Sequence, residues 1–437
     1  MMKLASTALL VTAVLLTSSG SHAQNSRGIR LDTVSGYFRA TPIGVEDMRY
    51  IGDRYITGDD SSLMRYVTTV VQRDIDFYAD FELVRVDNFY LITYEITEMN
   101  LFGWQRMGAD YVVKLEAEFP GPNLRTFWRL YDARTKSQIA KGNLEYKRQF
   151  WRELAHDISN EVVHFLTGDR GIFRTKIAYI KRVENAKEVC IADYNGANER
   201  QLTHTGTINI SPVFSPDGQM IFFTSYMEGD PQLFRVSVQT GEIERITDFD
   251  GIAAAPAVSP DGNKIACVLS KDGNSEIYVL DMEGNIIKRL TRHRAIDSSP
   301  TWSPDSRMIA YSSDRTGAPQ IYVMDSDGLN TRRLTYTGGY NDSPIWSDRG
   351  DRITFVSRTK FGRFDLASID TSGVDYRIMT EVGHNENPHF SPDGKHIVFS
   401  STRLSEGDIY TMDLSGRNQR RITRGANCSN PTWGPIR

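Results

Sequence analysis

Ser215-Pro216-Asp217-Gly218 is the first of a series of turns that divide the second half of this chain into equal repeats. The same four residues recur at positions 259–262 and 391–394, and variants of them stand at 303–306 and 347–350. The first serine of each turn follows the previous one after 44 residues. A fixed period of about 40–45 residues made of short strands is typical of β-propeller blades. The repeat therefore predicts a propeller, a fold that serves as a binding platform more often than as a catalyst.

Each repeat has the residue pattern of four short strands. Residues 211–214 end in an aromatic side chain before the turn, and residues 221–223 form the expected second strand. The third strand ends in an aspartate, as at Asp281, and the fourth ends in Leu-Thr or Ile-Thr. Five repeats are complete, and a sixth is split between residues 177–193 at the front of the array and 430–433 at its end. We expect six blades in a ring that the last strand closes, because closure removes exposed sheet edges.

Residues 36–168 lack this period and mix helical and strand patterns. Apolar side chains recur at helical spacing from Leu63 to Ile75, after a candidate cap at Asp59-Asp60-Ser61. A second helix is expected at 150–166, where Gly168 is a candidate C-cap. Three runs between the helices predict the strands of an antiparallel sheet: 111–115, 127–131 and 139–142. The sequence thus predicts an α/β N-terminal domain of two helices on a small sheet, a linker at 169–175 and an all-β propeller at 176–437.

The first residues carry a targeting pattern. A basic start at Lys3, an apolar run at 9–16 and small residues at Ser21 and Ala23 predict a cleaved secretory signal peptide over residues 1–23. The run is too short to span a bilayer comfortably, and a retained membrane anchor is the alternative. The mature protein is expected to start with a mobile arm at 24–35. A formal net charge of −4 gives no basis for nucleic-acid binding, and no other stretch predicts membrane insertion.

No set of residues predicts catalysis, a cofactor or a metal ion. The aspartates of the turns recur on separate blades, which indicates turn formation. His156 and His164 are eight residues apart, which is not the four-residue spacing of a zinc-binding helix. Cys190 and Cys267 lie in apolar strand runs and are expected to be buried. Cys428 is expected on a loop, where it is a candidate reactive thiol.

The loops that join one blade to the next are the candidate recognition elements. They are expected to emerge on one face around the central channel and differ in sequence while the strands keep their rhythm. The alternative is that they only close the funnel. The six loops comprise residues 205–209, 250–254, 294–298, 337–342, 382–386 and 425–429.

Several motifs outside the repeats resemble the TolB family of the Tol-Pal cell-envelope system. The strongest match is the domain junction, which runs from Ala155-His156-Asp157-Ile158 through Leu166-Thr167-Gly168 to residues 171–179. Pro42-Ile43-Gly44-Val45, Gly108-Ala109-Asp110 and Arg129-Leu130-Tyr131-Asp132 also resemble the N-terminal domain of that family. Together with the repeats, the resemblance covers nearly the whole chain.

The resemblance implies a monomeric periplasmic adaptor that catalyses no reaction and needs no cofactor. It implies that the propeller face binds the peptidoglycan-associated lipoprotein Pal, in support of outer-membrane integrity and cell division. Contacts are expected at Ile252, Ala255, Ser298, Asn341 and Asp342. This chain has Ile252 where the family has a histidine.

The same resemblance implies that the N-terminal arm binds a TolA-like protein linked to the inner membrane. The expected contacts on the arm are Asn25, Arg27, Ile29 and Leu31. Two other functional classes stay open. One is another exported interaction propeller. The other is an exported propeller hydrolase or lyase, which would need convergent carboxylates or a metal site in the central channel.

Overall fold

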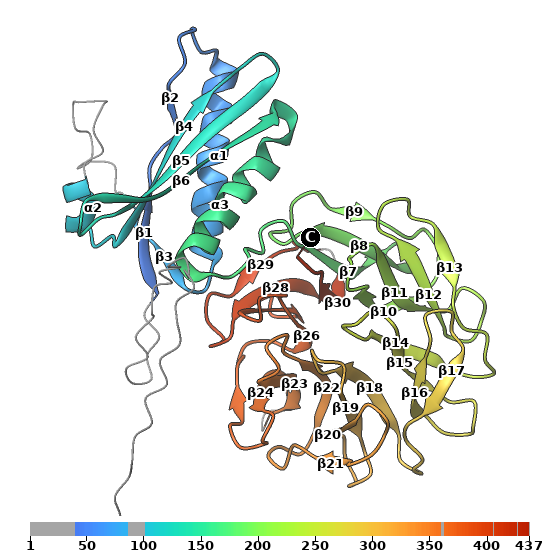
Figure 1. Cartoon of the computed structure of the whole chain (residues 1–437). Coiled ribbons are helices and arrows are strands. Elements are labelled where there is room, and N and C mark those ends of the chain that lie inside the picture. Colours follow the sequence, from blue (N-terminus) through green and yellow to red (C-terminus); the bar gives the residue numbers. More distant parts are fainter. Residues whose placement is uncertain (1–39, 86–100, 360–361, 405, 426, 437) are drawn as a thin grey trace, which may run out of the picture.

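The computed structural model describes residues 40–85, 101–359, 362–404, 406–425 and 427–436. Within them the chain forms an N-terminal α/β unit and a ring of six four-stranded sheets (Figure 1). This arrangement confirms the predicted fold class. The predicted signal peptide at 1–23 and arm at 24–35 lie outside the described residues. None of the described helices combines the length and the apolar character needed to cross a bilayer.

The sheet of the N-terminal unit is mixed rather than antiparallel. Its strands are β1 (Thr41–Val45), β2 (Arg49–Tyr50), β3 (Phe81–Leu83), β4 (Tyr111–Glu118), β5 (Asn123–Asp132) and β6 (Ser137–Lys147). Their order is β3-β1-β4-β5-β6, and β2 pairs with β4. The three predicted strands correspond to β4, β5 and β6 and pair antiparallel, as expected. The sequence analysis did not predict β1, which pairs parallel with β3 and β4 and makes the sheet mixed. The reason lies in the connection, because a crossover helix brings the following strand back in the parallel direction.

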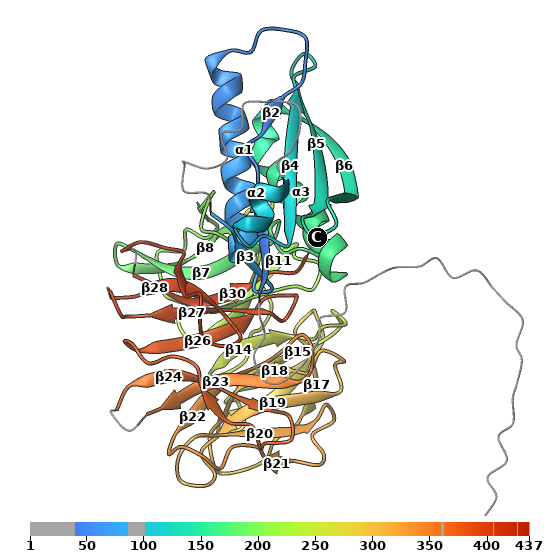
Figure 2. The same ribbon diagram turned by 90° about the vertical axis from the view of Figure 1, so that its left-hand side faces the viewer.

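Two long helices lie side by side on one face of this sheet (Figure 2). The helices of the unit are α1 (Gly58–Phe77), α2 (Leu101–Arg106), the 3-10 turn η1 (Arg148–Phe150) and α3 (Trp151–Thr167). Val67 and Val71 of α1 and Ile158 and Val162 of α3 are fully buried in the shared core. Their four-residue spacing places them on one face of each helix, as the sequence predicts. The short helix α2 was not predicted.

The ends of the long helices follow local chemistry. Gly168 adopts the left-handed conformation with φ 78° and donates its N–H to the His164 carbonyl, which confirms the predicted C-cap. The predicted N-cap of α1 is wrong by two or more residues. Thr57 is the cap, since its Oγ1 accepts the Asp60 N–H at 3.1 Å and the Asp60 carboxylate accepts the Thr57 N–H at 3.0 Å. This capping box explains why the helix begins before the acidic pair.

The propeller consists of six antiparallel sheets, which confirms the blade count. Five of them follow chain order: β10 to β13, β14 to β17, β18 to β21, β22 to β25, and β26 to β29. The first strands are β10 (Asn209–Phe214), β14 (Ala253–Val258), β18 (Asp297–Trp302), β22 (Asn341–Trp346) and β26 (Asn385–Phe390). The second strands are β11 (Met220–Ser225), β15 (Ile265–Leu269), β19 (Met308–Ser313), β23 (Arg352–Arg358) and β27 (His396–Ser401). The third strands are β12 (Gln232–Ser237), β16 (Glu276–Leu280), β20 (Gln320–Asp325), β24 (Phe364–Asp370) and β28 (Asp408–Asp413). The fourth strands are β13 (Ile243–Arg245), β17 (Ile286–Arg289), β21 (Arg332–Arg333), β25 (Arg377–Ile378) and β29 (Arg420–Arg421).

The sixth blade combines the two ends of the array, as predicted. Its strands β7 (Lys176–Val183), β8 (Ala186–Asp193) and β9 (Arg200–Gln201) come from the front, and β30 (Cys428–Trp433) comes from the end. β30 pairs antiparallel with β7 in the order β30-β7-β8-β9, so the C-terminal strand closes the ring.

The aspartates of the Ser-Pro-Asp-Gly turns shape the turns. Asp217 Oδ1 accepts the Ser215 hydroxyl at 2.6 Å and the Gln219 N–H at 2.9 Å. The equivalent aspartates of three other blades repeat this pattern: Asp261, Asp305 and Asp393. The interpretation of these residues as turn formers is confirmed for all four. The fourth blade departs from it, because Asp348 stands at the proline position and Arg349 at the aspartate position.

The two units meet through buried polar contacts that join α1 and the segment after it to the propeller. Asp74 of α1 accepts the hydroxyl of Tyr194, in the turn after β8, through Oδ1. Its Oδ2 lies 2.8 Å from Nδ1 of His156 in α3, a contact within the N-terminal unit that orients the carboxylate. Lys395, in the turn before β27, forms ion pairs with Asp80 and Asp169. The N-terminal unit is therefore attached beside the Ser-Pro-Asp-Gly turns of the ring (Figure 2).

Candidate protein-binding face

The inter-blade loops gather at one end of the blades. Strands alternate in direction within a blade, so each first strand begins at a loop and ends at a Ser-Pro-Asp-Gly turn. The loops and the turns consequently lie at opposite ends of the ring, and the N-terminal unit contacts the turn end through Lys395. The loop end is the candidate face, and it surrounds the mouth of the central channel.

The channel is lined by the six first strands, each of which contains the same irregularity. A residue with positive φ precedes a proline in every one, and the strand register shifts at this point. These residues are Ser211, Ala255, Ser299, Ser343, Asn387 and Asn430, with φ between 47° and 54°. Small or amide side chains tolerate this left-handed conformation best among L-residues. The six bulges surround a cavity of about 390 Å³.

The lining of this cavity offers little for acid–base catalysis. Among the described residues that line it, Asp348 carries the one carboxylate and His389 the one imidazole. Burial lowers the pKa of His389. The described residues also contain no group of three or more His, Cys, Asp or Glu side chains placed to hold a metal ion. A channel enzyme of the kind considered above would use several such groups converging from different blades.

Buried side chains hold the inter-blade loops in place, and the sequence analysis missed them. The threonine that follows each fourth strand accepts a backbone N–H from the third strand. In five blades it also donates to the side chain of the residue just before that N–H. The donor–acceptor pairs are Thr203–Glu188, Thr247–Gln232, Thr335–Gln320, Thr380–Asp365 and Thr423–Asp408. All five acceptor side chains are nearly or fully buried. The sequence contains a pattern that could have revealed these pairs. An acidic or amide residue precedes the threonine at the same separation, 15 residues, in all five blades.

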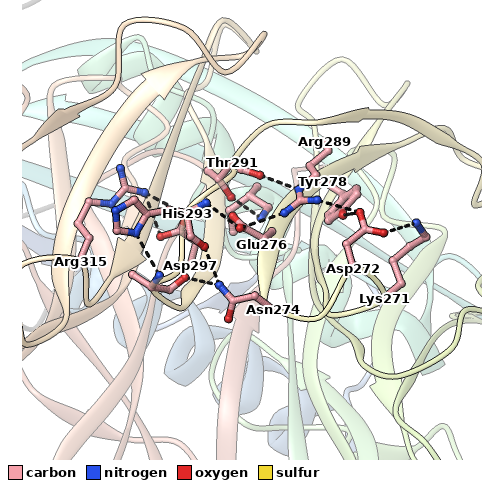
Figure 3. A network of polar contacts seen from close by, with 12 residues as sticks. Lys271, Asp272, Asn274, Glu276, Tyr278, Arg289, Thr291, His293, Asp297 and Arg315 are labelled. Carbon is pink, nitrogen blue, oxygen red and sulfur yellow. Dashed lines mark hydrogen bonds and ion pairs between the residues drawn. The ribbon is translucent and has the colours of Figure 1, made fainter.

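The loop between β17 and β18 shows how such contacts fix a loop (Figure 3). Glu276 Oε1 accepts the His293 N–H at 2.8 Å, and Asn274 Nδ2 donates to the carbonyls of His293 and Ala295 at 2.8 and 2.6 Å. At the end of the loop, fully buried Asp297 pairs with Arg315 at 3.0 Å. The backbone of this loop is thus bound at several points while its outer side chains stay exposed.

The structure extends the first strands into the predicted loops. β14, β18 and β22 begin at Ala253, Asp297 and Asn341, so the loop boundaries that included residues 254, 298 and 342 are wrong. The bulge is the reason, because pairing continues on both sides of the positive-φ residue and adds residues before the proline. Ala255, Ser298, Asn341 and Asp342 therefore lie in strands.

The five expected contact residues come together around the channel mouth but differ in accessibility. Ile252 lies in the loop before β14 with its side chain exposed. Ala255 and Ser298 are half-buried in β14 and β18. Asn341 is fully buried and its Nδ2 donates to Gln320 Oε1 at 2.9 Å, which is a structural role. Asp342 is half-buried and accepts the Tyr340 hydroxyl at 2.9 Å.

The expected contacts on the arm, at Asn25, Arg27, Ile29 and Leu31, lie outside the described residues. The cysteine prediction is half right. Cys190 and Cys267 are buried, as expected. The placement of Cys428 on a loop is wrong, because it begins β30, is buried, and its pKa is raised to about 12 by burial. Such a thiol is not the reactive group that the sequence suggested.

Comparisons with known proteins agree with this architecture. A family model described as the TolB β-propeller domain matches residues 163–437. The Tol-Pal system protein TolB of Nitrosomonas europaea is 45% identical over 376 residues, which cover 86% of this chain and 88% of the relative. The protein of the same name from Roseobacter denitrificans is 30% identical over 239 residues, which cover 53% of this chain and 52% of the relative. The chain thus spans about half the length of this and several other curated relatives.

A solved structure extends the likeness to both units. The crystal structure of TolB from Acinetobacter baumannii superposes with a TM-score of 0.80 at 26% sequence identity. The alignment covers 91% of this chain and 97% of that chain, and hence includes the N-terminal unit as well as the ring.

Proposed function

This chain belongs to the TolB family, and on that premise we propose that it acts as a periplasmic protein-binding adaptor of the Tol-Pal system rather than as an enzyme. The observation that carries the proposal is the ring of loops at the channel mouth, whose backbones are bound by buried side chains such as Glu188, Gln320 and Asp408. A rigid scaffold that holds exposed loops is the usual arrangement of a recognition surface.

The propeller face is proposed to bind a peptidoglycan-associated lipoprotein, in keeping with the system for which the relatives are named. Of the expected contacts, Ile252 is exposed, and Ala255, Ser298 and Asp342 are half-buried. A partner could therefore touch part of each of these side chains. Asn341 contributes by holding the loop rather than by touching the partner. The N-terminal arm is proposed to bind a TolA-like protein of the inner-membrane complex through Asn25, Arg27, Ile29 and Leu31.

The proposed organisation follows from these roles. A signal peptide at 1–23 sends the chain across the inner membrane, and the arm at 24–35 precedes the α/β domain at 36–168. A linker at 169–175 leads to the propeller at 176–437. The monomeric adaptor then connects the lipoprotein to the inner-membrane complex and supports outer-membrane integrity and cell division.

Calorimetry with purified components tests the proposal. The chain from Gln24 is titrated with the soluble domain of the lipoprotein from the same bacterium, and a saturable one-to-one complex is expected. A matched titration uses a chain that lacks residues 24–32. An arm that competes for its own domain and for a partner would change the lipoprotein affinity, because linked equilibria typically couple by about 1–3 kcal/mol. The absence of binding by the intact chain would refute the adaptor role, and equal affinities with and without the arm would refute the coupling.

A further inference from the structure

We infer that Ile208, Ile252 and Ile296 form one apolar contact surface, the isoleucine arc, which receives an apolar segment of the protein partner. We further infer that the oppositely charged loops before Ile252 and Ile296 set the direction of that segment. The inference rests on the proposed function, since it names the chemistry by which the loop face would recognise a protein. It concerns a part of the face that lies over three of the six blades.

The arc begins with a sixfold backbone pattern. The residue before each first strand uses its carbonyl to accept an N–H from the end of the next strand in its blade. The donor–acceptor pairs are Tyr226–Ile208, Ser270–Ile252, Asp314–Ile296, Arg358–Tyr340, Thr402–His384 and Arg182–Asn427, with distances between 3.0 and 3.3 Å. The backbone is therefore equivalent in all six blades, while the side chains are isoleucine in three consecutive blades and tyrosine, histidine and asparagine in the others.

Two of the three isoleucines are held through their own N–H groups as well. The N–H of Ile252 donates to Ser270 Oγ at 2.8 Å, and the N–H of Ile296 donates to Asp314 Oδ1 at 2.9 Å. The loop that carries Ile296 is also bound by the contacts drawn in Figure 3. Because the backbone of these residues is already fixed, little conformational entropy is lost when a partner covers them. More of the free energy gained by burying their side chains then contributes to affinity.

The three isoleucine side chains are 44%, 42% and 52% exposed. A single exposed isoleucine is ordinary on a protein surface. Here, however, three occupy the same position in neighbouring blades whose first strands touch one another. Tyr226 is also exposed beside Ile208, since its N–H donates to the Ile208 carbonyl. Exposed isoleucines at equivalent positions of three neighbouring blades, with an aromatic side chain beside the first, have the composition of the energetic centre of a protein interface.

The loops before the second and third isoleucines carry opposite charge. Asp248 and Asp250 are exposed just before Ile252, and Arg292 and Arg294 are exposed just before Ile296. Charges at the rim of an interface mainly determine orientation and association rate. The partner that fits is consequently a polypeptide segment with apolar side chains over the arc, an acidic side chain toward Arg294 and a basic side chain toward Asp250.

Substitution of the arc tests this inference in the same calorimetric titration with the soluble lipoprotein domain. Ile252→Lys and Ile296→Lys are each expected to weaken the complex by about tenfold or more, the loss typical of an interface centre. The control is Leu329→Lys, which changes an apolar side chain that is at least as exposed, in the turn after β20 at the other end of the blade. It should bind within about twofold of the unchanged chain. Thermal unfolding of all variants verifies that the fold is retained.

A charge reversal tests the orientation. Arg294→Glu should slow association and flatten its dependence on ionic strength, as removal of a rim charge does. Binding by the unchanged chain together with equal affinities of the arc variants and the control would overturn the inference and leave the proposed function intact. Loss of affinity in the arc variants with unaltered kinetics of Arg294→Glu would overturn the orientation. Failure of the unchanged chain to bind would overturn the proposed function and the inference with it.

Discussion

The indole Nε1 of Trp433 donates a hydrogen bond to Thr175 Oγ1 at 2.8 Å, so the strand that closes the ring is tied to the linker that opens it. Both side chains are buried. The ring of Trp433 also lies 6.4 Å from that of Phe77 of α1, measured between centroids. Ring closure and attachment of the N-terminal unit therefore share one set of contacts.

Removal of this closing contact should be unusually costly. Trp433→Ala is expected to destabilise the protein by about 3–5 kcal/mol or more, because it opens a cavity and loosens the pairing of β30 with β7. Trp346→Ala is the matched control, since Trp346 is a buried tryptophan at the same position of a blade whose strands are continuous in the chain. Urea unfolding compares the two variants. A deletion of residues 430–437 should cost still more, and an unchanged melting temperature of that deletion would refute closure by β30.

The ion pairs of Lys395 should hold the two units together. Lys395→Met leaves Asp80 buried without its cation, which typically costs about 3–5 kcal/mol. The double variant Lys395→Met, Asp80→Asn should recover part of that loss, because it removes the stranded charge. Thermal unfolding measures the stabilities, and small-angle scattering reports the arrangement of the units. Equal stabilities of the single and double variants would show that Asp80 is not stranded.

The buried threonines after the fourth strands should contribute to the stability of the protein and to the order of the loops that follow them. Thr335→Val preserves the shape but loses the donor to Gln320 Oε1 and the acceptor for the Ile321 N–H. The Ile321 N–H loses its side-chain acceptor, while Gln320 Oε1 keeps only the hydrogen bond from Asn341 Nδ2. The loss is expected to cost about 1–3 kcal/mol and to speed amide exchange in the following loop. Thr337→Val, an exposed threonine in the same loop, is the control and should change little. Similar exchange in the two variants would contradict the proposed role of the buried pair.

The cysteines should be inert while the protein is folded. Burial raises the pKa of Cys190 and of Cys428 to about 12, so the thiolate is scarce at pH 8. An ordinary cysteine, with a pKa near 8.5, is substantially ionised there. Ellman's reagent should therefore detect almost no thiol at pH 8 until denaturant is added, and three thiols per chain afterwards. Rapid labelling of the native protein, lost in Cys428→Ser, would contradict the buried position of this residue.

The contacts of Asp272 should give the stability a defined pH dependence. Hydrogen bonds from Tyr278 and Lys271 lower the pKa of this carboxyl from 3.8 to about 2 (Figure 3). A lowered native pKa means that the contribution is present above pH 4 and is lost as the pH falls toward 2. Asp272→Asn should consequently differ most from the unchanged protein near pH 6, and the difference should shrink below pH 4. A constant difference in unfolding free energy across that range would refute the assignment.

Local patterns account for what could be predicted. The Ser-Pro-Asp-Gly turn is formed by neighbours in the chain, as the Ser215–Asp217 bond shows, so its recurrence reveals blade number without any distant contact. The split sixth blade was also predicted, because five complete repeats leave unpaired strand patterns at the two ends of the array. For the candidate site, the sequence predicted that the inter-blade loops share one end of the ring, but it misplaced the strand starts, because the bulge at Ala255 depends on pairing with another strand. The buried pairs such as Thr335–Gln320 were missed although their spacing repeats.

The sequence by itself determined the number of blades, the split of the sixth blade and the C-cap at Gly168, since the repeat is marked by local turns and the cap by one helical turn. Only the tertiary structure decided which side chains meet across the chain. Asp80 and Lys395 pair although they are far apart in sequence, and no periodicity relates them. It also decided that Cys428 is buried while Ile296 is exposed, because accessibility depends on what the whole fold places over a side chain. Turns obey local sterics, whereas burial and charge pairing are properties of the assembled ring.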